Sequence, residues 1–429
     1  MRKKKIIAFA LAFTLAGALL AGCGGQAEKP ETASEETVAE TTAEGEKTTE
    51  KTEEEDALVI PDINIEKEYA VPDTEAFKFV KDLKIGFSLG NTFDAFNDGG
   101  TMDEMEIESC WQGVMTTEKM IKDFHAAGFE TVRIPISWHN HLSDDFTISE
   151  KWLNRVNEVV DWAINDGMYV IINIHHDNED AFEYPSYDKM DQSKKYVTKI
   201  WEQIADRFAE YDEHLIYESM NEPRQVGTDH EWWINDKNSA TAKECFDCVN
   251  QLNQAIVDTI RANGKGYNGS RYIMVPGYCA NPEFELINDF VLPDDSKATA
   301  ENRIILSVHA YTPYSFALEQ PGTPDFDIAA RKGTGDISSF MKRLYEKFVV
   351  KGIPVVIGEY GALEKNGNDD ARKQFAAYYV AMARHYGLTT VWWDNNAHNA
   401  SGECFQLINR SSVTWTYPEI RDQIIYYCE

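Results

Sequence analysis

Short apolar runs alternate with amphipathic stretches along residues 57–429. Eight runs rich in branched and aromatic residues have the length and composition of buried strands, and the segments between them, such as 117–127 and 150–166, have helical periodicity. The predicted strands are 85–89, 130–135, 169–174, 215–220, 272–275, 304–308, 354–357 and 389–392. Strand and helix alternating eight times predict an α/β protein, a single (β/α)8 TIM barrel domain.

The first 56 residues follow a different pattern. Residues 1–22 join a basic start to an apolar stretch too short to span a membrane comfortably, which is typical of a signal peptide. Leu20-Ala21-Gly22-Cys23 resembles a bacterial lipoprotein cleavage site, which predicts lipidation of Cys23 and an extracellular protein anchored to the outer face of a membrane. An ordinary signal peptide, and hence secretion, is the alternative. Residues 23–56 hold twelve acidic residues, three lysines and no aromatic residue, and predict a disordered tether.

The formal net charge of −31 narrows the choice of partners. A strongly acidic surface argues against nucleic acid and is compatible with a neutral partner. The sequence contains no evident metal-ligand cluster or phosphate-binding glycine loop, so neither a metal nor a cofactor is predicted. Cys245-Phe-Asp-Cys248 has the spacing of a redox or zinc half-site, but without a second pair or nearby His the two thiols are interpreted as free or structural.

Two glutamates follow predicted strands at the end where a TIM barrel carries its active site. Glu222 comes after the fourth strand and Glu359 after the seventh. Hydrolysis of a glycosidic bond needs two such carboxylates, one to protonate the leaving oxygen and one to attack or stabilise the sugar carbon. We therefore predict Glu222 as the general acid/base, with a pKa raised by the neighbouring charge, and Glu359 as the ionised nucleophile.

Seven further polar residues, which lie near or just after the ends of predicted strands, are expected to bind the substrate or its transition state. They are Asn91, Arg133, His175, His176, Asn221, His309 and Tyr311. Arg133 supplies positive charge to the nucleophile and Tyr311 donates a hydrogen bond to it. Asn221 bonds the sugar 2-hydroxyl, a contact that strengthens as charge develops. His175 and His309 orient the glutamates and the sugar through ring N–H groups.

Aromatic rings stack on the flat faces of sugars, so tryptophans near strand ends are the other candidates. Trp393 is predicted as the floor beneath the reacting sugar. Four more, in predicted loops or at strand ends, are weaker candidates for substrate platforms: Trp111, Trp138, Trp232 and Trp233.

These motifs occur in an order that resembles a known family. They are Gly86-Phe-Ser-Leu-Gly-Asn91-Thr-Phe-Asp-Ala95, Arg133-Ile-Pro135, His175-His176, Asn221-Glu222-Pro223, His309-Ala-Tyr311, Gly358-Glu359 and Trp392-Trp393-Asp394-Asn395. Together they resemble glycoside hydrolase family 5, in particular its branch rich in bacterial endo-β-1,4-glucanases, licheninases and xyloglucanases. Phe87-Ser88 stands where that branch usually has Trp-Asn. The resemblance implies retention of configuration through a glycosyl intermediate on Glu359, and a monomer.

The expected function is endo-acting hydrolysis of internal β-1,4-glucosidic bonds in a polysaccharide, with cellulose, mixed-linkage glucan and xyloglucan as candidate substrates. An endo-β-mannanase or a xylanase on the same scaffold is the alternative enzyme. A glycan-binding lipoprotein without activity is the alternative from another class. The intact pair of glutamates argues against a protein without activity.

Overall fold

The computed structural model describes Ile63 and residues 69–428. The signal segment 1–22, Cys23 and the tether 23–56 lie outside the described residues. The described residues all belong to one compact unit, which contains the barrel.

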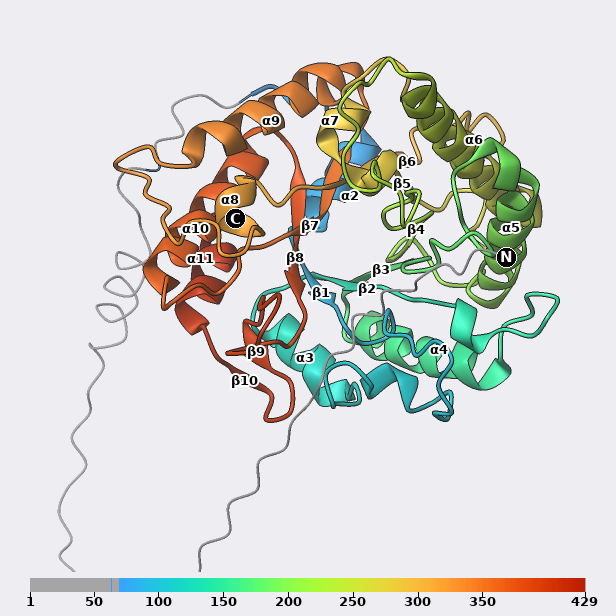
Figure 1. Ribbon diagram of the computed structural model, residues 1–429, viewed down its shortest axis with the longest axis horizontal. Helices are drawn as coiled ribbons and strands as arrows, with labels where there is room; N and C mark the ends of the chain where they lie inside the picture. The colour runs from blue at the N-terminus through green and yellow to red at the C-terminus, as the bar shows by residue number, and fades with distance from the viewer. Residues whose placement is uncertain (1–62, 64–68, 429) are drawn as a thin grey trace, which may run out of the picture. The chain divides into compact units, whose positions relative to one another are not determined.

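Eight parallel strands close into a barrel in the order β1 to β8, which confirms the predicted fold class (Figure 1). Each predicted strand is present, with ends that differ by at most three residues. The strands are β1 Ile85–Leu89, β2 Thr131–Ile134, β3 Tyr169–Asn173, β4 Leu215–Glu218, β5 Ile273–Pro276, β6 Ile304–His309, β7 Val355–Tyr360 and β8 Thr389–Asp394. A small antiparallel pair, β9 Ile408–Asn409 and β10 Thr414–Trp415, follows β8.

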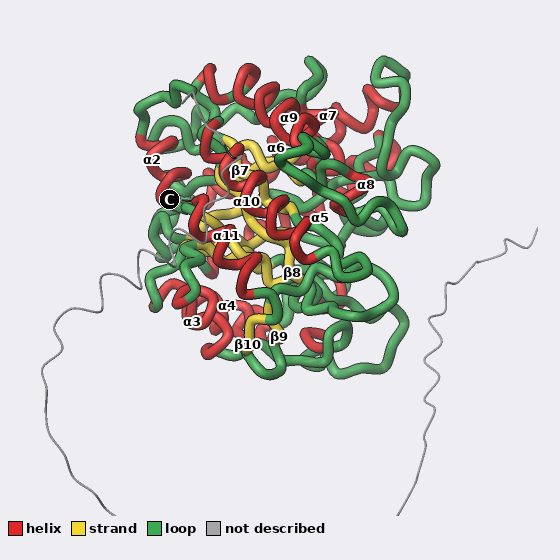
Figure 2. Tube along the Cα trace, turned by 90° about the vertical axis from the view of Figure 1, so that its left-hand side faces the viewer, coloured by secondary structure: helices red, strands yellow, loops and turns green. Residues whose placement is uncertain are grey.

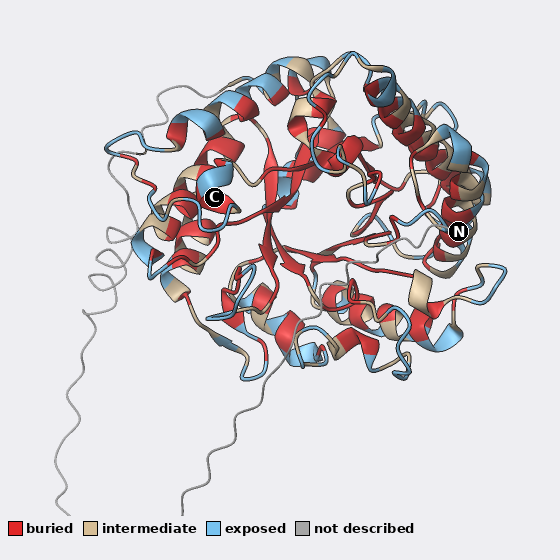
Figure 3. Ribbon diagram, viewed as in Figure 1, coloured by how far each residue is buried: buried red, intermediate tan, exposed pale blue. Residues whose placement is uncertain are grey.

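Helices surround the strands and turn their buried faces toward them (Figure 3). The α-helices are α2 Glu75–Asp82, α3 Glu118–Ala126, α4 Glu150–Asn165, α5 Met190–Arg207, α6 Ala240–Asn263, α7 Pro282–Glu285, α8 Tyr314–Ala317, α9 Thr334–Lys347, α10 Asp369–His385 and α11 Pro418–Cys428. Short 3-10 turns are η1 Ile107–Ser109, η2 His139–His141, η3 Tyr187–Lys189, η4 Tyr278–Ala280 and η5 Val349–Lys351. None of the helices in residues 69–428 has the length and apolar character that a membrane crossing requires.

Local signals explain where two of the longer elements begin and end. The Thr117 hydroxyl accepts a hydrogen bond from the Met120 amide and starts α3, as an N-cap should. Ser239 caps α6 in the same way, and Gly264, with φ 64°, ends it in the left-handed conformation that favours glycine. Within α6, Cys245 and Cys248 are buried, which raises the pKa of each thiol to about 12. Both are free thiols in the structure, which agrees with their interpretation as free or structural.

The barrel interior has an apolar layer at the amino-terminal end of the strands. Side chains alternate along each strand, so one set points into the barrel. That set packs against Ala76, Phe79 and Val80 of α2 and against Leu83, which follows the helix, and it includes Ile171, Ile216, Met274, Ile305, Val356 and Val391. Helix α2 thereby closes this end of the barrel, and it lies on the left in Figure 2.

Polar side chains occupy the next interior positions toward the carboxyl ends. Each lies two residues after a member of the apolar layer and therefore on the same face of its strand: Asn173 on β3, Glu218 on β4 and Ser307 on β6. On β8 the aromatic ring of Trp393 holds the equivalent position. Arg133 on β2 belongs to this layer as well. The fold thus places a polar layer directly beneath the ends of the strands.

Candidate active site

A cleft of about 1110 Å³ opens at the carboxyl ends of the strands. Most of the predicted site residues line it, and the structure brings them together from separate elements: His175, His176, Asn221, Glu222, Trp232, Trp233, His309, Tyr311, Glu359 and Trp393. The volume is above the roughly 300–1,000 Å³ that is usual for small-molecule sites, so the cleft has room for several linked rings.

Glu222 and Glu359 reach the same part of this cleft. Glu222 follows β4, and Glu359 lies on β7, next to a register shift between Ile357 and Tyr360. One oxygen of each carboxylate and one nitrogen of His309 all lie within 4.8 Å of one another. Carboxyl groups about 5 Å apart are typical of retaining hydrolysis, whereas inversion needs roughly 6.5–9.5 Å to admit a water molecule.

Arg133 joins three elements around Glu359. Its guanidinium is fully buried and donates from Nη1 to Glu359 Oε1 at 2.7 Å and from Nη2 to Asn221 Oδ1 at 2.7 Å. The Tyr311 hydroxyl donates to Glu359 Oε2 at 2.9 Å. Both oxygens of Glu359 therefore accept hydrogen bonds, one from a permanent cation, as the sequence predicted for Arg133 and Tyr311.

The protonation of Glu222 differs from the sequence-based expectation. Burial raises the pKa of Glu222, but the hydrogen bond and charge of His309, whose Nδ1 lies 2.9 Å from Glu222 Oε1, outweigh burial and lower it. Burial also lowers the pKa of His309, yet the carboxylates of Glu359, Glu218 and Glu222 raise it to about 10. His309 therefore holds the proton that was expected on Glu222.

The pKa of Glu359 is raised. Burial is the largest cause and the charge of Glu222 adds to it, while His309, Arg133 and Tyr311 oppose the rise. Burial also raises the pKa of Tyr311 well above its usual range, so Tyr311 remains a hydrogen-bond donor.

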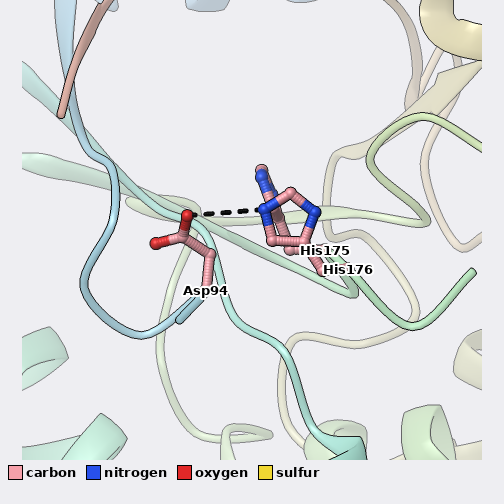
Figure 4. Close-up of side chains that lie close together, drawn as sticks. All are labelled: Asp94, His175 and His176. Atoms are coloured by element: carbon pink, nitrogen blue, oxygen red, sulfur yellow. Dashed lines mark ion pairs between the residues drawn. The ribbon is translucent and has the colours of Figure 1, made fainter. Parts of the chain in front are cut away.

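Asp94, His175 and His176 lie close together at one side of the cleft, in the arrangement of a possible metal site (Figure 4). The hydrogen bonds of Asn173 argue against that role. Its Oδ1 accepts from the Ile136 amide at 3.0 Å, so its Nδ2 is the donor to His175 Nδ1 at 3.2 Å. The lone pair of Nδ1 is thus occupied, and the other ring nitrogen of His175 carries the hydrogen.

His175 is therefore a neutral hydrogen-bond donor rather than a metal ligand. Burial lowers its pKa well below the usual value, and the nearby charges of His176 and Arg133 act in the same direction. Its ring is parallel to that of Trp393, with centroids 5.7 Å apart. Both rings line the cleft that also holds Glu222 and Glu359.

The tryptophans differ in their exposure. Trp232 and Trp233 line the cleft with 55% and 45% of their surface exposed. The Arg224 guanidinium lies 4.0 Å from the centre of the Trp232 ring and supports that ring from one side. Trp111 is 41% exposed and its ring lies 5.6 Å from that of His176, but it is not among the residues that line the cleft.

Two predicted contacts are corrected by the structure. Trp138 is completely buried, and its Nε1 donates to the Asn173 carbonyl at 3.0 Å, so it packs in the core and is no substrate platform. Asn91 has a left-handed backbone, φ 57°, and its backbone N–H donates a hydrogen bond to Asp94 Oδ2 at 3.0 Å. It lies outside the cleft lining and shapes the turn after β1 instead.

Two residues of the site were not among those predicted from the sequence. Glu218 lies in the polar layer and is bonded to Arg133, and Arg224 donates to the Glu222 carbonyl at 3.1 Å. A charged residue inside an otherwise apolar strand was the available signal for Glu218, because such a residue must face a buried partner. Arg224 follows Pro223 directly, and its sequence position carried no comparable signal.

Two carboxylates at this spacing on the rim of a TIM barrel can hydrolyse a glycosidic bond. The fold and the cleft therefore define the protein as a glycoside hydrolase. A family model described as cellulase (glycosyl hydrolase family 5) matches residues 94–399. The chain belongs to glycosyl hydrolase family 5.

Solved structures and curated relatives agree with this assignment. A GH5 lichenase from Caldicellulosiruptor sp. F32 is 50% identical with a TM-score of 0.84, over 86% of this chain and 100% of that one, and a mutant of it forms a complex with cellotetraose. Endoglucanase B of Neocallimastix patriciarum is 39% identical, over 83% of this chain and 72% of the relative. The cellulase/esterase CelE of Acetivibrio thermocellus is 40% identical over 81% of this chain, which spans only 40% of CelE.

Replacement of Gly90 by Ala tests how Trp393 is held. A Cβ at position 90 would lie 2.6 Å from the Trp393 ring and 2.8 Å from the Asp394 carbonyl. We expect Gly90→Ala to lose about 1–3 kcal/mol of unfolding free energy in urea and to displace the ring. Gly335→Ala is the control, because no atom lies within 4 Å of its added Cβ. Equal unfolding free energies of the two variants would contradict the close approach of the Trp393 ring to the backbone of Gly90.

Proposed function

We propose that the chain hydrolyses internal β-1,4-glucosidic bonds of plant cell-wall glucans with retention of configuration. The observation that carries this proposal is the approach of Glu222 and Glu359 within 4.8 Å, because that gap leaves no room for a water molecule to attack directly. Glu359 then attacks the sugar itself, and a glycosyl-enzyme intermediate follows.

In the first step Glu359 attacks the anomeric carbon while Glu222 protonates the leaving oxygen. Arg133 and Tyr311 hold the two oxygens of Glu359 and favour the ionised form that attacks. When a sugar fills the cleft and excludes water, the charged form of Glu222 is destabilised. The proton of His309 Nδ1 is then transferred to Glu222 Oε1, which lies 2.9 Å from that nitrogen, and on to the leaving group.

In the second step Glu222 acts as the base. Its carboxylate takes a proton from a water molecule, which attacks the anomeric carbon from the side that the leaving group has vacated. The bond to Glu359 breaks and its carboxylate is restored. The proton that Glu222 took from water passes back to His309, so both groups regain their starting charges. Asn221, held by Arg133, is placed for the sugar 2-hydroxyl, a contact that strengthens in both transition states.

The cleft and the relatives together indicate a glucan. The Caldicellulosiruptor structure is that of a lichenase, and its mutant binds cellotetraose, so mixed-linkage glucan and cellulose are the first substrates to test. Release of reducing ends from a panel of mixed-linkage glucan, cellulose, xyloglucan, mannan and xylan would rank them. Rapid loss of viscosity with few new reducing ends would show internal cleavage.

Variants of the two glutamates test the mechanism. Glu359→Ala should abolish turnover, and azide should restore it with inverted product, because azide enters the space of the missing carboxylate. Glu222→Ala should retain activity only on substrates whose leaving group needs no protonation. The measurements are product configuration by NMR and rates on aryl glycosides. Azide rescue of Glu359→Ala with retained configuration would refute the nucleophile assignment.

Trp232→Ala tests the exposed rings as sugar platforms. Loss of one stacking contact, about 0.5–1.5 kcal/mol, should raise KM for a polymeric glucan between about 2- and 12-fold with kcat little changed. Trp138→Ala is not a suitable comparison because Trp138 is core, so Trp111→Ala, outside the cleft lining, serves as the control. An unchanged KM for Trp232→Ala would remove this ring from the binding surface.

We also propose, from the cleavage-site sequence around Cys23, that the enzyme is tethered to the outer face of a membrane. That it is a monomer is proposed on the family resemblance alone. Metabolic labelling with a radioactive fatty acid should mark the full chain, and Cys23→Ala should abolish the label and release activity into the medium. Equal labelling of both forms would rule out Cys23 as the lipidated residue. Size-exclusion chromatography of the released form checks the oligomeric state.

A further inference from the structure

A third carboxylate lies beneath the catalytic pair and takes no part in the two chemical steps. Glu218 is the last residue of β4 and is completely buried in the polar layer of the barrel. Its oxygens accept hydrogen bonds from three side chains: Ser307 Oγ at 2.6 Å, Asn173 Nδ2 at 2.9 Å and Arg133 Nε at 2.8 Å. A buried charge with this many donors is held firmly in one place.

Glu218 also faces the ring of His309. The two ring nitrogens of His309 point at different carboxylates: Nδ1 lies 2.9 Å from Glu222 Oε1 and 3.7 Å from Glu359 Oε2, and Nε2 lies 3.7 Å from Glu218 Oε1. A neutral imidazole carries a hydrogen on only one nitrogen. A ring with carboxylates at both nitrogens therefore fits the doubly protonated cation, and Glu218 supplies the charge on the side away from the cleft.

The glycine before the nucleophile leaves space for this contact. A Cβ at Gly358 would lie 3.1 Å from His309 Nε2, 3.2 Å from Glu218 Oε1 and 3.2 Å from Ser307 Oγ. Any larger residue would press the three groups apart. Glu359 is thus the proposed nucleophile, and the absence of a side chain at Gly358 lets His309, Glu218 and Ser307 pack closely beneath it.

We propose that Glu218 is a positioning residue: it is the buried counter-ion of Arg133 and His309, and it keeps His309 doubly protonated and aimed at Glu222. The pKa values agree with this role. Burial raises the pKa of Glu218, but Arg133, His309 and Ser307 outweigh it and hold the pKa at about 2, so Glu218 is charged throughout the neutral range.

The other charged groups near His309 do not replace Glu218. The titratable groups around the ring are Glu218 on β4, Glu222 after β4, Glu285 on α7, His175 after β3 and Glu359 on β7, with Arg133 on β2 beyond them. Burial raises the pKa of Glu285 to about 8, so it is uncharged at pH 7. His175 is neutral there as well. Glu222 and Glu359 change charge during the reaction, which leaves Glu218 as the constant negative charge.

The direct test is the titration of His309 by nitrogen-15 NMR, with the resonance assigned by its loss in His309→Gln. In the unaltered protein, both ring nitrogens should be protonated at pH 7, because the raised pKa keeps the cation until the pH approaches about 10. Glu218→Gln removes one negative charge and should lower the pKa of His309 by about 1–3 units. Glu285→Gln makes the same chemical change at a buried carboxyl that forms no ion pair with His309, so it should leave both ring nitrogens protonated at pH 7 and shift the titration less than Glu218→Gln does.

The pH dependence of kcat/KM gives a second readout, which rests on the proposed glucan hydrolysis. Activity needs the proton shared by His309 and Glu222, so it is lost as the pH rises through the pKa of that pair. Glu218→Gln should move this alkaline limit to lower pH by about 1–3 units. A residue that only supports packing would lower kcat without moving the limit.

Three outcomes would overturn the proposal. His309 could be singly protonated at pH 7 in the unaltered protein, a result that decides the matter even if Glu218→Gln does not fold. A folded Glu218→Gln protein could keep the His309 titration of the unaltered protein, or Glu285→Gln could shift it equally. If the NMR result is as expected but the protein does not hydrolyse glucan, the proposed function is refuted, whereas the proposed role of Glu218 in holding His309 protonated is still supported.

Discussion

The site depends on one buried cation, the guanidinium of Arg133. It lies inside the barrel without contact with solvent and is bonded to carboxylates on β4 and β7 and to the amide of Asn221. A buried charge is tolerated only when it is fully paired, and removal of one partner leaves an uncompensated charge. Arg133 therefore requires both Glu218 and Glu359, and the strands that carry them are linked through it.

Along the barrel axis, an apolar layer that stabilises the fold lies below a polar layer that supports the cleft. At the amino-terminal end of the strands, side chains of α2 and apolar side chains that point into the barrel form the apolar layer. One layer higher, the same strand faces carry Asn173, Glu218 and Ser307, which bond one another and the groups of the cleft. Because the strands are continuous through both layers, the packing below fixes the positions of the polar groups above.

Electrostatics in the site are collective. Glu222 and Glu359 interact with each other, with His309 and with Arg133, so the proton at neutral pH belongs to the group of residues and settles on His309. Burial raises the pKa of Glu222, but the hydrogen-bonded His309 cation lowers it more. The balance depends on distances of a few ångströms, such as the 2.9 Å between His309 and Glu222.

The sequence by itself determined the eight strands, their order and the identity of the paired glutamates, because strand periodicity and polar residues at strand ends are local properties of the chain. Only the tertiary structure decided which of those residues meet. It buried Trp138, left Asn91 outside the cleft lining, joined Glu218 to residues 85 and 89 positions away and reversed the expected direction of the pKa shift of Glu222. Burial, ring orientation and pKa arise from contacts between distant segments, and no local pattern of residues specifies them.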